Sequence, residues 1–366
     1  HLCSDCGHLQ ILFVGNPEVQ YRDYTYTTSL SLGLAKHFED TAAHVIARLA
    51  LQPGDNVLEF GSNDGTYLRA FQAAGMSIAG IDPAVEIARH ATSRGIPTIG
   101  EFFSMSLARK IREETGPVDL LVANNVIANI DNLADVFHGA KAVLKDDGAF
   151  VFETQYGLDV TEHLLLDTVY HEHLSYFNVA PLQRALKAYG LTVFDVERIP
   201  TKGGSIRVYT QPIGAARPCD DRVEACLRLE QTLGCEQKVY FDTVDTRITA
   251  WREQVHALMA PYVDRGTPIA GYGVSVGTTS LLAQLHLEQA IDFVVDDDPD
   301  KPDAMIGPGY RIPVCRPGDL ISQEAALTIL FAWRYAKAIT EQHADYARQG
   351  GKFLLPLPDP AILSIQ

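Results

Sequence analysis

The chain has 366 residues, 46% hydrophobic and 21% charged, which is enough for two or three domains with packed cores. Its 46 acidic and 30 basic residues give a formal net charge of −16, so it lacks a sequence-wide basic surface for nucleic acid or an anionic membrane. No apolar run approaches the roughly 20 residues that cross a bilayer, and the first residues do not resemble a signal peptide. We therefore expect a cytoplasmic protein, a monomer or homodimer, whose partner is a small molecule and neither a nucleic acid nor a membrane.

Cys3 and Cys6 have the C-x-x-C spacing that supplies two of the four ligands of a tetrahedral zinc site. The sequence has no second pair of this kind, and two histidines so close to the pair, His1 and His8, would strain a site. Because the chain starts without methionine, we interpret residues 1–20 as the remnant of a zinc-binding N-terminal domain. Its first ligand pair is then missing here, so Zn²⁺ itself can be absent. An incidental cysteine pair is the alternative.

Short apolar runs alternate with amphipathic stretches over residues 21–211, which we assign to one domain. Strands are predicted at 56–60, 77–81, 97–99, 118–123 and 149–153, and helices at 67–74, 84–94, 133–144 and 181–189. This alternation predicts a doubly wound parallel sheet of the α/β class.

The end of this domain departs from the alternation. Strands predicted at 192–199 and 205–210 are separated only by the glycine turn at 201–204, so they must be antiparallel. Five parallel strands followed by an antiparallel hairpin are typical of class I methyltransferases, whereas a dinucleotide-binding Rossmann sheet ends parallel.

A glycine-rich turn follows the first predicted strand, where open α/β sheets bind ligands. Gly61 and Gly65 let the backbone approach the methionine part of a cofactor, with Asn63 between them. Glu59 or Asp64 can meet the ammonium group of that cofactor. The turn lacks the G-x-G-x-x-G pattern that binds a pyrophosphate, which favours S-adenosylmethionine over NAD.

Polar residues at two other predicted strand ends support this site. Asp82 ends the second strand, where a carboxylate can accept both ribose hydroxyls. Asn124 and Asn125 end the fourth strand at the same edge. A tight turn with a helix-capping aspartate is the structural alternative.

Residues 170–173 form a dense run of titratable groups after the fifth strand: Tyr170, His171, Glu172 and His173. Histidine is the usual general base near neutral pH, and a neighbouring carboxylate can orient it. A metal site is the less favoured alternative, because alternate residues of an extended segment point to opposite sides.

Two further regions complete the chain. The hydroxyl-rich stretch 21–29 precedes a predicted helix with His37 and Phe38, and is either a substrate-binding lid or a polar loop that caps the helix. The sequence of residues 212–366 predicts a helical linker and a Rossmann-like domain, with a strand and glycine turn at 268–277 and strands at 291–295 and 327–331. Independent cofactor binding there is the minor interpretation, since that unit is short.

The ordered motifs resemble the sugar-nucleotide C-methyltransferases, which methylate deoxysugars of antibiotics and surface glycans. The resemblance spans nearly the whole chain and rests on segments 3–7, 24–31, 59–65, 123–126, 170–173, 202–207, 271–273, 295–297 and 308–314. It implies a zinc-binding N-terminus, a methyltransferase core and a C-terminal Rossmann-like domain that helps hold the nucleotide sugar.

The resemblance also implies residue roles. A base removes the hydrogen next to a sugar keto group, and the resulting enolate attacks the methyl group of S-adenosylmethionine. His173 matches the base and Glu172 its support, while Tyr24 and Tyr170 match residues that bind or polarise sugar oxygens. Asn129 replaces a family histidine, so any acid role there is lost.

Further departures from the family concern the substrate. The family's lysine is missing from 271–277, and 333–337 differs from the usual pattern. Methylation of oxygen or nitrogen on a related substrate is therefore the alternative reaction. A cofactor-binding but inactive partner and an NAD-dependent sugar enzyme are less favoured.

Overall fold

A computed structural model describes residues 1–22, 24, 27–28, 33–301, 304–307 and 309–363. The chain forms two compact units. The first contains residues 1–157 and 171–236, and the second contains residues 158–170 and 237–366. Within the described ranges, no helix combines the length and apolar character needed to cross a membrane.

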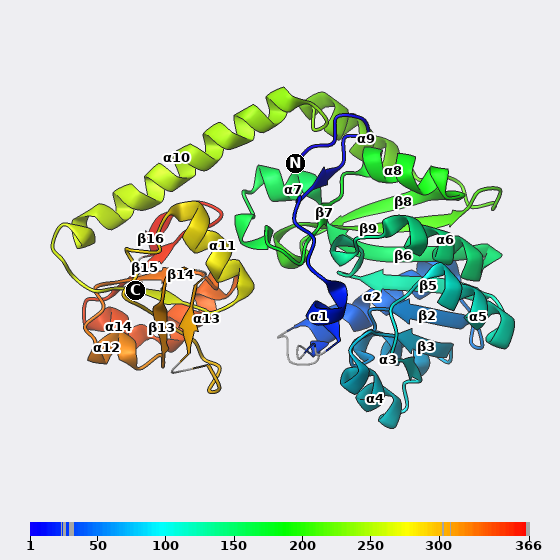
Figure 1. The fold of residues 1–366 in the computed structure, drawn as a ribbon, viewed down its shortest axis with the longest axis horizontal. Helices are drawn as coiled ribbons and strands as arrows, with labels where there is room; N and C mark the ends of the chain where they lie inside the picture. The colour runs from blue at the N-terminus through cyan, green and yellow to red at the C-terminus, as the bar shows by residue number, and fades with distance from the viewer. Residues whose placement is uncertain (23, 25–26, 29–32, 302–303, 308, 364–366) are drawn as a thin grey trace. The chain divides into compact units, whose positions relative to one another are not determined.

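The first unit is built on a seven-stranded sheet in the order β4-β3-β2-β5-β6-β9-β8 (Figure 1). The first five of these pair in parallel, while β9 is antiparallel to both of its neighbours. The strands are β2 (Asn56–Phe60), β3 (Ser77–Ile81), β4 (Thr98–Ile99), β5 (Val118–Asn124), β6 (Leu144–Gln155), β8 (Leu191–Ile199) and β9 (Ser205–Pro212). The predicted class I methyltransferase sheet is thus confirmed, and the second strand of the hairpin is inserted between β6 and β8.

The first unit also contains helices before, between and after these strands. They are α1 (Pro17–Tyr21), α2 (Leu34–Leu49), α3 (Thr66–Ala73), α4 (Val85–Ser93), α5 (Met105–Thr115), α6 (Leu133–Val143), α8 (Val179–Ala188) and α9 (Asp221–Leu233), with short 3₁₀ turns η2 (Ile127–Asn129) and η4 (Thr201–Gly203). A two-stranded ladder pairs β1 (Leu9–Gln10) with β7 (Ser175–Tyr176). Helix α5 was not predicted, because its charged sequence buries only three side chains, Leu107, Ala108 and Ile111.

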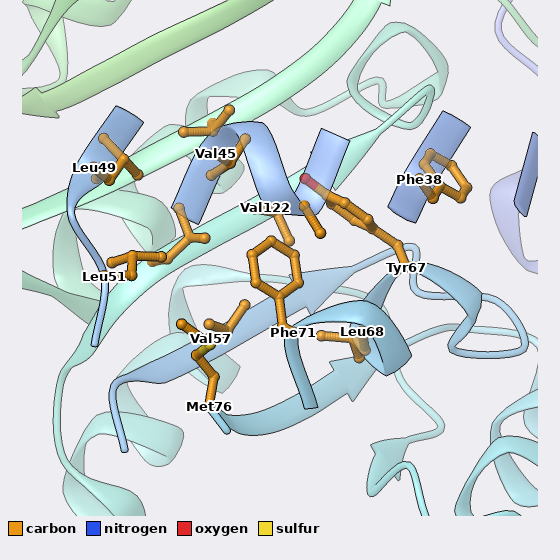
Figure 2. Close-up of a cluster of buried hydrophobic side chains, with 14 of the residues drawn as sticks. Phe38, Val45, Leu49, Leu51, Val57, Tyr67, Leu68, Phe71, Met76 and Val122 are labelled. Carbon is orange, nitrogen blue, oxygen red and sulfur yellow. The ribbon is translucent and has the colours of Figure 1, made fainter. Parts of the chain in front are cut away.

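The core of this unit lies on both sides of the sheet. On one side α2 and α3 pack against β2 and β5, where Figure 2 shows Phe71 of α3 among Val57, Val122 and Val45. Side chains alternate along a strand, so Phe60 points to the opposite side. There its ring stacks on Phe103 at 4.6 Å between centroids. These two apolar layers fix the strand ends that carry the polar residues described below.

The second unit has its own seven-stranded sheet, in the order β12-β13-β11-β10-β14-β15-β16. The strands are β10 (Ile269–Tyr272), β11 (Phe293–Val295), β12 (Met305–Ile306), β13 (Ile312–Cys315), β14 (Leu327–Leu330), β15 (Lys352–Leu355) and β16 (Ala361–Leu363). The five central strands are parallel, and only the two edge strands are antiparallel. The unit is therefore a complete doubly wound domain, larger than the three-stranded half predicted from sequence.

Helices of the second unit are α7 (Gly157–Glu162), α10 (Lys238–Val263), α11 (Val276–Leu285), α12 (Asp319–Ser322), α13 (Ala336–Gln342) and α14 (Ala344–Arg348), with 3₁₀ turns η3 (Leu166–Thr168) and η5 (Trp333–Tyr335). The 26-residue helix α10 is anchored by its side chains. The indole nitrogen of Trp251 donates to the carbonyl of Pro356 at 2.7 Å, and Arg252 donates to the carbonyl of Gln284 at 2.7 Å.

Candidate active site

The turn between β2 and α3 requires three residues in the left-handed region: Gly61 at φ +65°, Asn63 at +50° and Gly65 at +75°. Gly61 is also needed for space, because a Cβ atom there would lie 2.2 Å from Cγ2 of Val126. A Cβ on Gly65 would lie 2.7 Å from Cγ2 of Ile96. The backbone of this turn therefore packs closely against the segment before β4 and the segment after β5, where only glycine leaves enough space.

Glu59 places a carboxyl group at the buried end of β2, with 3% of the residue exposed. Burial raises the pKa of Glu59 well above its ordinary value, the ionised Asp82 raises it further, and the amide of Asn124 lowers it. Around this end of β2, the buried polar atoms that make no hydrogen bond with the described part of the chain include Glu59 Oε2, Ser62 Oγ and Asn124 Nδ2. Such atoms are costly unless a ligand pairs with them. They fit the amino-acid part of a cofactor.

Asp82 follows β3 and accepts two backbone hydrogen bonds, from the N–H of Asn63 at 2.8 Å and from that of Ala84 at 2.9 Å. Burial raises the pKa of Asp82, and these two amides lower it. One carboxylate thus braces the glycine turn and the entry to α4. Each oxygen still has a second lone pair for a ribose hydroxyl.

Asp64 and Asn125 have mainly local backbone roles. The Oδ1 of Asp64 accepts from the hydroxyl of Thr66 at 2.6 Å and from its N–H at 3.2 Å, immediately before α3, whose N-cap residue is Gly65. Asn125 has φ +56°, and its N–H donates to the carbonyl of Glu153 at 2.8 Å. The sequence analysis offered two carboxylates, Glu59 and Asp64, for the ammonium group of the cofactor. Of these two, Glu59 has a buried oxygen without a hydrogen-bond partner in the described part of the chain.

The hydroxyl-rich stretch reaches the glycine turn, since the N–H of Thr28 donates to Oδ1 of Asn63 at 2.8 Å. Asp23, Thr25, Tyr26 and Ser29 of this stretch, and residues 30–32 after it, lie outside the described residues. Helix α2 begins after Gly33 without a side-chain cap, so the interpretation of this stretch as a Ser or Thr cap is wrong.

A second cluster of polar side chains gathers around η2, which follows β5. The ring of Tyr21 lies edge-on to that of Tyr24, with centroids 5.8 Å apart. Burial of the Tyr21 hydroxyl raises its pKa, and ionised Glu172 raises it further, while the side chain of Asn129 lowers it. Tyr24, which was predicted as catalytic, therefore contacts this phenol, and two other predicted residues, Asn129 and Glu172, shift its pKa.

His173 is 8% exposed, whereas His171 is exposed to solvent. The segment that carries both is fixed to η2 by a hydrogen bond from the N–H of Leu174 to the carbonyl of Ala128, at 2.7 Å. Tyr170 is half-buried and belongs to the second unit.

Cys3 and Cys6 lie in a turn closed by hydrogen bonds from Gly7 N–H to the Cys3 carbonyl at 3.0 Å and from Cys3 N–H to the His8 carbonyl at 2.8 Å. The backbone amides of Cys6 and Asp5 lower the pKa of the Cys3 thiol. Burial raises the pKa of Cys6, while the amide of His8 lowers it. Among the described residues, no three or more His, Cys, Asp or Glu side chains lie together in a group that could hold a metal ion.

Known proteins match both halves of the chain. Residues 34–196 match the methyltransferase domain family, and residues 200–358 match the C-methyltransferase C-terminal domain family. The chain is 31% identical over 366 residues to the C-methyltransferase NovU of Streptomyces niveus, covering all of this chain and 87% of that protein. The chain belongs to the C-methyltransferase family. It is an S-adenosylmethionine-dependent methyltransferase, as the turn after β2 indicated.

Solved structures with a similar fold are more distant from this C-methyltransferase. The PH0226 protein of Pyrococcus horikoshii OT3 is 18% identical with a TM-score of 0.42, covering 51% of this chain and 95% of that one. The magnesium protoporphyrin IX methyltransferase of Synechocystis PCC 6803 is 13% identical with a TM-score of 0.38, covering 49% and 83%.

The C-methyltransferase also has a buried ionic network that the sequence analysis missed. Glu153, at the end of β6 and opposite Asn124, is 1% exposed. Its carboxylate accepts from Arg207 at 2.6 Å and is 2.9 Å from Nε2 of His37. Hydrogen bonds from His37 and the charge of Arg207 keep the pKa of Glu153 below its usual value despite burial. Charged residues inside the apolar runs of β6 and β9 were the sequence signal for this network.

The second unit of this C-methyltransferase has its own polar groups at the end of β10. The hydroxyl of Tyr272 donates to Asp297 at 2.8 Å and is 2.8 Å from Nε2 of His343. Asp296 accepts from the N–H of Val274 at 2.6 Å and from Lys301 at 3.2 Å. These bonds order the glycine turn at 271–277. Pro308, the first residue of the motif at 308–314, lies outside the described residues.

Proposed function

We propose that this enzyme methylates the carbon next to a keto group of a nucleoside-diphosphate deoxysugar, with His173 as the base. Membership of the C-methyltransferase family supports carbon as the acceptor atom. The observation that carries the proposal is the hydrogen bond from Leu174 N–H to the Ala128 carbonyl, which fixes the segment bearing buried His173 to η2, where Asn129 lies.

The bound cofactor supplies an electrophilic methyl group. The proposed binding residues are Glu59 for its ammonium and Asp82 for its ribose hydroxyls, with Gly61, Asn63, Asp64, Gly65, Asn124 and Asn125 lining the same edge. The orphaned oxygen of Glu59 supports this assignment, because a buried carboxylate stabilises a cation far better than water-exposed groups do.

The chemical step begins at the sugar. An imidazole nitrogen of His173 takes the proton from the carbon next to the ketone, and the electron pair moves onto the carbonyl oxygen as an enolate. A bound S-adenosylmethionine would supply the methyl group that the enolate carbon takes up, with the thioether sulfur as the leaving group. Glu172 orients His173 and stabilises its imidazolium, and Tyr24 and Tyr170 hold sugar oxygens.

Proton exchange tests the base. Incubation with dTDP-4-keto-6-deoxyglucose in heavy water should exchange the hydrogen next to the ketone. We expect His173→Asn to slow exchange by about 10²–10⁴-fold, the usual contribution of a general base. The matched control is His171→Asn, an exposed histidine two residues away, which should exchange at the wild-type rate. Unchanged exchange in His173→Asn would place the base elsewhere.

The same experiment separates the alternative reaction. Methylation of oxygen or nitrogen on a related substrate needs a base but no adjacent ketone, so it would proceed without exchange at carbon. Titration with S-adenosylmethionine and with NAD should show binding of the former only.

We also propose that Cys3 and Cys6 supply two ligands of a Zn²⁺ site. The turn supports this, because its backbone hydrogen bonds hold Cys3 and Cys6 in one loop, and the amides of Cys6 and Asp5 favour the Cys3 thiolate, the form that binds metal. Zinc analysis of the purified chain tests it, with Cys3→Ser and Cys6→Ser expected to lower bound zinc and Cys219→Ser, an exposed cysteine elsewhere, to leave it unchanged.

A further inference from the structure

His37 is the most exposed member of the buried network that it forms with Glu153 and Arg207. Its side chain is 22% exposed, whereas those of Glu153 and Arg207 are 2% and 7% exposed. The network lies at the carboxyl end of β6, where Glu153 pairs with Asn124 at the end of β5. The imidazole is therefore the group through which this network can meet a ligand.

The hydrogen bonds of His37 decide which ring nitrogen carries a hydrogen. Nε2 lies 2.9 Å from Oε2 of Glu153 and 3.2 Å from its Oε1. Despite burial, hydrogen bonds from His37 and the charge of Arg207 keep the pKa of Glu153 below its usual value, so this carboxylate is ionised and only accepts. Nε2 must then donate, and in the neutral ring Nδ1 is an acceptor. Within the described part of the chain, the hydrogen bonds of the ring all involve Nε2, which leaves Nδ1 open.

Helix α2 places His37 at the same edge of the sheet as the proposed cofactor site. His37 is the fourth residue of this helix, and its N–H donates to the carbonyl of Gly33 at 3.0 Å. The next residue, Phe38, contacts Tyr67 in the first turn of α3, with ring centroids 5.0 Å apart (Figure 2). The first turns of α2 and α3 are therefore neighbours, and α3 begins directly after the glycine turn.

The position of the network along the sheet indicates which ligand His37 meets. Asp82 follows β3 and Glu59 lies on β2, so the proposed contacts to the ribose and the ammonium of the cofactor lie at these two strands. Glu153 lies on β6, two strands from β2 in the order β3-β2-β5-β6, which is about 10 Å at the usual strand spacing. Because the ammonium and the ribose hydroxyls are matched elsewhere, the methyl acceptor is the ligand left for His37.

The chemistry of Nδ1 restricts the group that it can bind. An unprotonated ring nitrogen pairs with a hydroxyl or an amino hydrogen, and neither a keto oxygen nor a phosphate oxygen provides one. A keto-deoxysugar carries hydroxyl groups on its ring beside the ketone. A ring hydroxyl is thus the part of the proposed substrate that fits this nitrogen.

We infer that Nδ1 of His37 accepts a hydrogen bond from one ring hydroxyl of the methyl acceptor, an inference that rests on the proposed function. His37 is then a specificity-determining binding residue, while His173 keeps the proposed role of base. Glu153 and Arg207 hold the imidazole in the orientation that directs Nδ1 away from the buried network.

Binding of dTDP-4-keto-6-deoxyglucose, measured by calorimetric titration, tests this assignment. We expect His37→Gln to raise the Kd about tenfold, equivalent to one lost hydrogen bond of about 1.4 kcal/mol, with an unchanged Kd for S-adenosylmethionine. The glutamine amide can still reach Glu153 but has no atom at the place of Nδ1. The matched control is His44→Gln, on the same helix, where an exposed histidine also pairs with a glutamate, Glu197 at 2.7 Å. This control should leave both dissociation constants unchanged.

Analogues of the sugar nucleotide that lack one ring hydroxyl identify the group that is bound. Removal of the hydroxyl at C2 or of the hydroxyl at C3 should raise the wild-type Kd about tenfold for one of the two. His37→Gln should bind that same analogue within about twofold of the full sugar, because the variant has already lost the contact that the hydroxyl makes. The wild-type titrations need no variant, so they test the inference even if His37→Gln does not fold.

Thermal unfolding separates binding from a structural role. Because His37→Gln keeps a donor to Glu153, its Tm should stay within about 4 °C of the wild-type value, the shift expected for a loss of about 1 kcal/mol.

Each outcome decides. An unchanged Kd of the wild type for both analogues, or of His37→Gln for the full sugar, overturns this inference alone. A larger fall in Tm together with weaker S-adenosylmethionine binding also overturns it, because it indicates a histidine that supports the cofactor site. A wild type that binds no sugar nucleotide and shows neither exchange nor methylation overturns the proposed function and this inference with it.

Discussion

Gly61 and Val126 are in such close contact that the space for a Cβ atom on Gly61 is already filled by Cγ2 of Val126, 2.2 Å away. The turn that approaches the cofactor is therefore shaped by a side chain from the segment after β5. The contact also joins the two polar regions of the site, since Val126 directly precedes η2, where Asn129 lies.

Gly61→Ala should damage both stability and cofactor binding. The alanine would have to adopt φ +65° and displace Val126, so we expect a loss of about 2–5 kcal/mol in the free energy of unfolding. Urea denaturation and calorimetric titration with S-adenosylmethionine measure the two effects. Gly54→Ala is the matched control, because Gly54 has φ +94° but open space around it, so only the backbone strain applies. Equal losses of unfolding free energy in Gly61→Ala and Gly54→Ala would contradict the steric argument. Adding Val126→Ala to Gly61→Ala should restore part of the lost stability, because it removes the clashing methyl groups.

Glu59→Gln should stabilise the empty enzyme while weakening cofactor binding. The pKa of Glu59 is raised in the folded state, so the fold binds its proton more tightly than the unfolded chain does. The stabilisation that protonated Glu59 gives the wild-type fold is then lost as the pH rises above about 4.5, the ordinary pKa of a glutamate. We expect the variant to be the more stable protein at pH 8, and its affinity for S-adenosylmethionine to fall by about 1.5–3 kcal/mol. Chemical denaturation measures the stability and calorimetric titration measures the affinity. Both are done between about pH 6 and 8.5, where proteins are ordinarily stable.

The pH dependence of binding provides the control for that prediction. Ionised Glu59 attracts the ammonium of the cofactor, so wild-type affinity should increase with pH and Glu59→Gln should lack this component. An identical pH slope in the two proteins would show that Glu59 does not meet the ammonium.

Arg207→Ala should destabilise the first unit strongly. Arg207 is 7% exposed at its side chain and donates to Glu153, Glu197 and the hydroxyl of Thr41. Its loss leaves the buried Glu153 carboxylate with His37 alone, which typically costs about 3–5 kcal/mol. Chemical denaturation measures this. Arg89→Ala, which breaks an exposed pair with Glu86, should change stability by about 0.5 kcal/mol or less, and Arg207→Lys should be intermediate. A small effect in Arg207→Ala would mean that water replaces the guanidinium.

Glu230→Gln should have an effect that depends on pH. The Glu230 carboxylate accepts from the N–H groups of Val179 at 2.6 Å and Ala180 at 2.9 Å, and from the hydroxyl of Tyr156 at 2.8 Å. It thereby caps α8 from another helix. Burial raises the pKa of Glu230, so its contribution to stability is greatest at low pH and falls as pH rises above about 4.5.

Stability measured at pH 5 and at pH 8 checks this prediction. The difference between wild type and Glu230→Gln should be larger at pH 5. Glu224→Gln changes an exposed carboxylate on the same helix and should give the same small difference at both values. A difference for Glu230→Gln that grows with pH would reverse the sign of the argument.

The sequence predicted the first sheet well because each of its main strands is an apolar run bounded by glycine, proline or polar residues. It predicted the second sheet less completely. Strands β13 and β15 have only four residues each, and Pro313 lies within β13, so they lack a clear pattern. The glycine turn was predicted because its residues are contiguous.

Residues that act across long sequence separations could not be predicted in the same way. His37, Glu153 and Arg207 meet only because α2, β6 and β9 pack together, and no spacing in the chain encodes that contact. The roles of His173 and Glu172 remain predictions that the exchange experiment decides.

The path of the chain between the two units limits how the enzyme can be divided. The chain leaves the first unit after Gly157 and contributes residues 158–170 to the second, where Asp167 accepts hydrogen bonds from Trp333 and Arg334. It then returns to the first unit to supply His173, β8 and β9. The first unit therefore cannot be expressed by itself as one continuous segment. A fragment ending at Glu236 would keep the 13 residues 158–170, just before the proposed base, but would lack the residues of the second unit that they pack with. Chimeras between relatives would therefore need to exchange two separate stretches together.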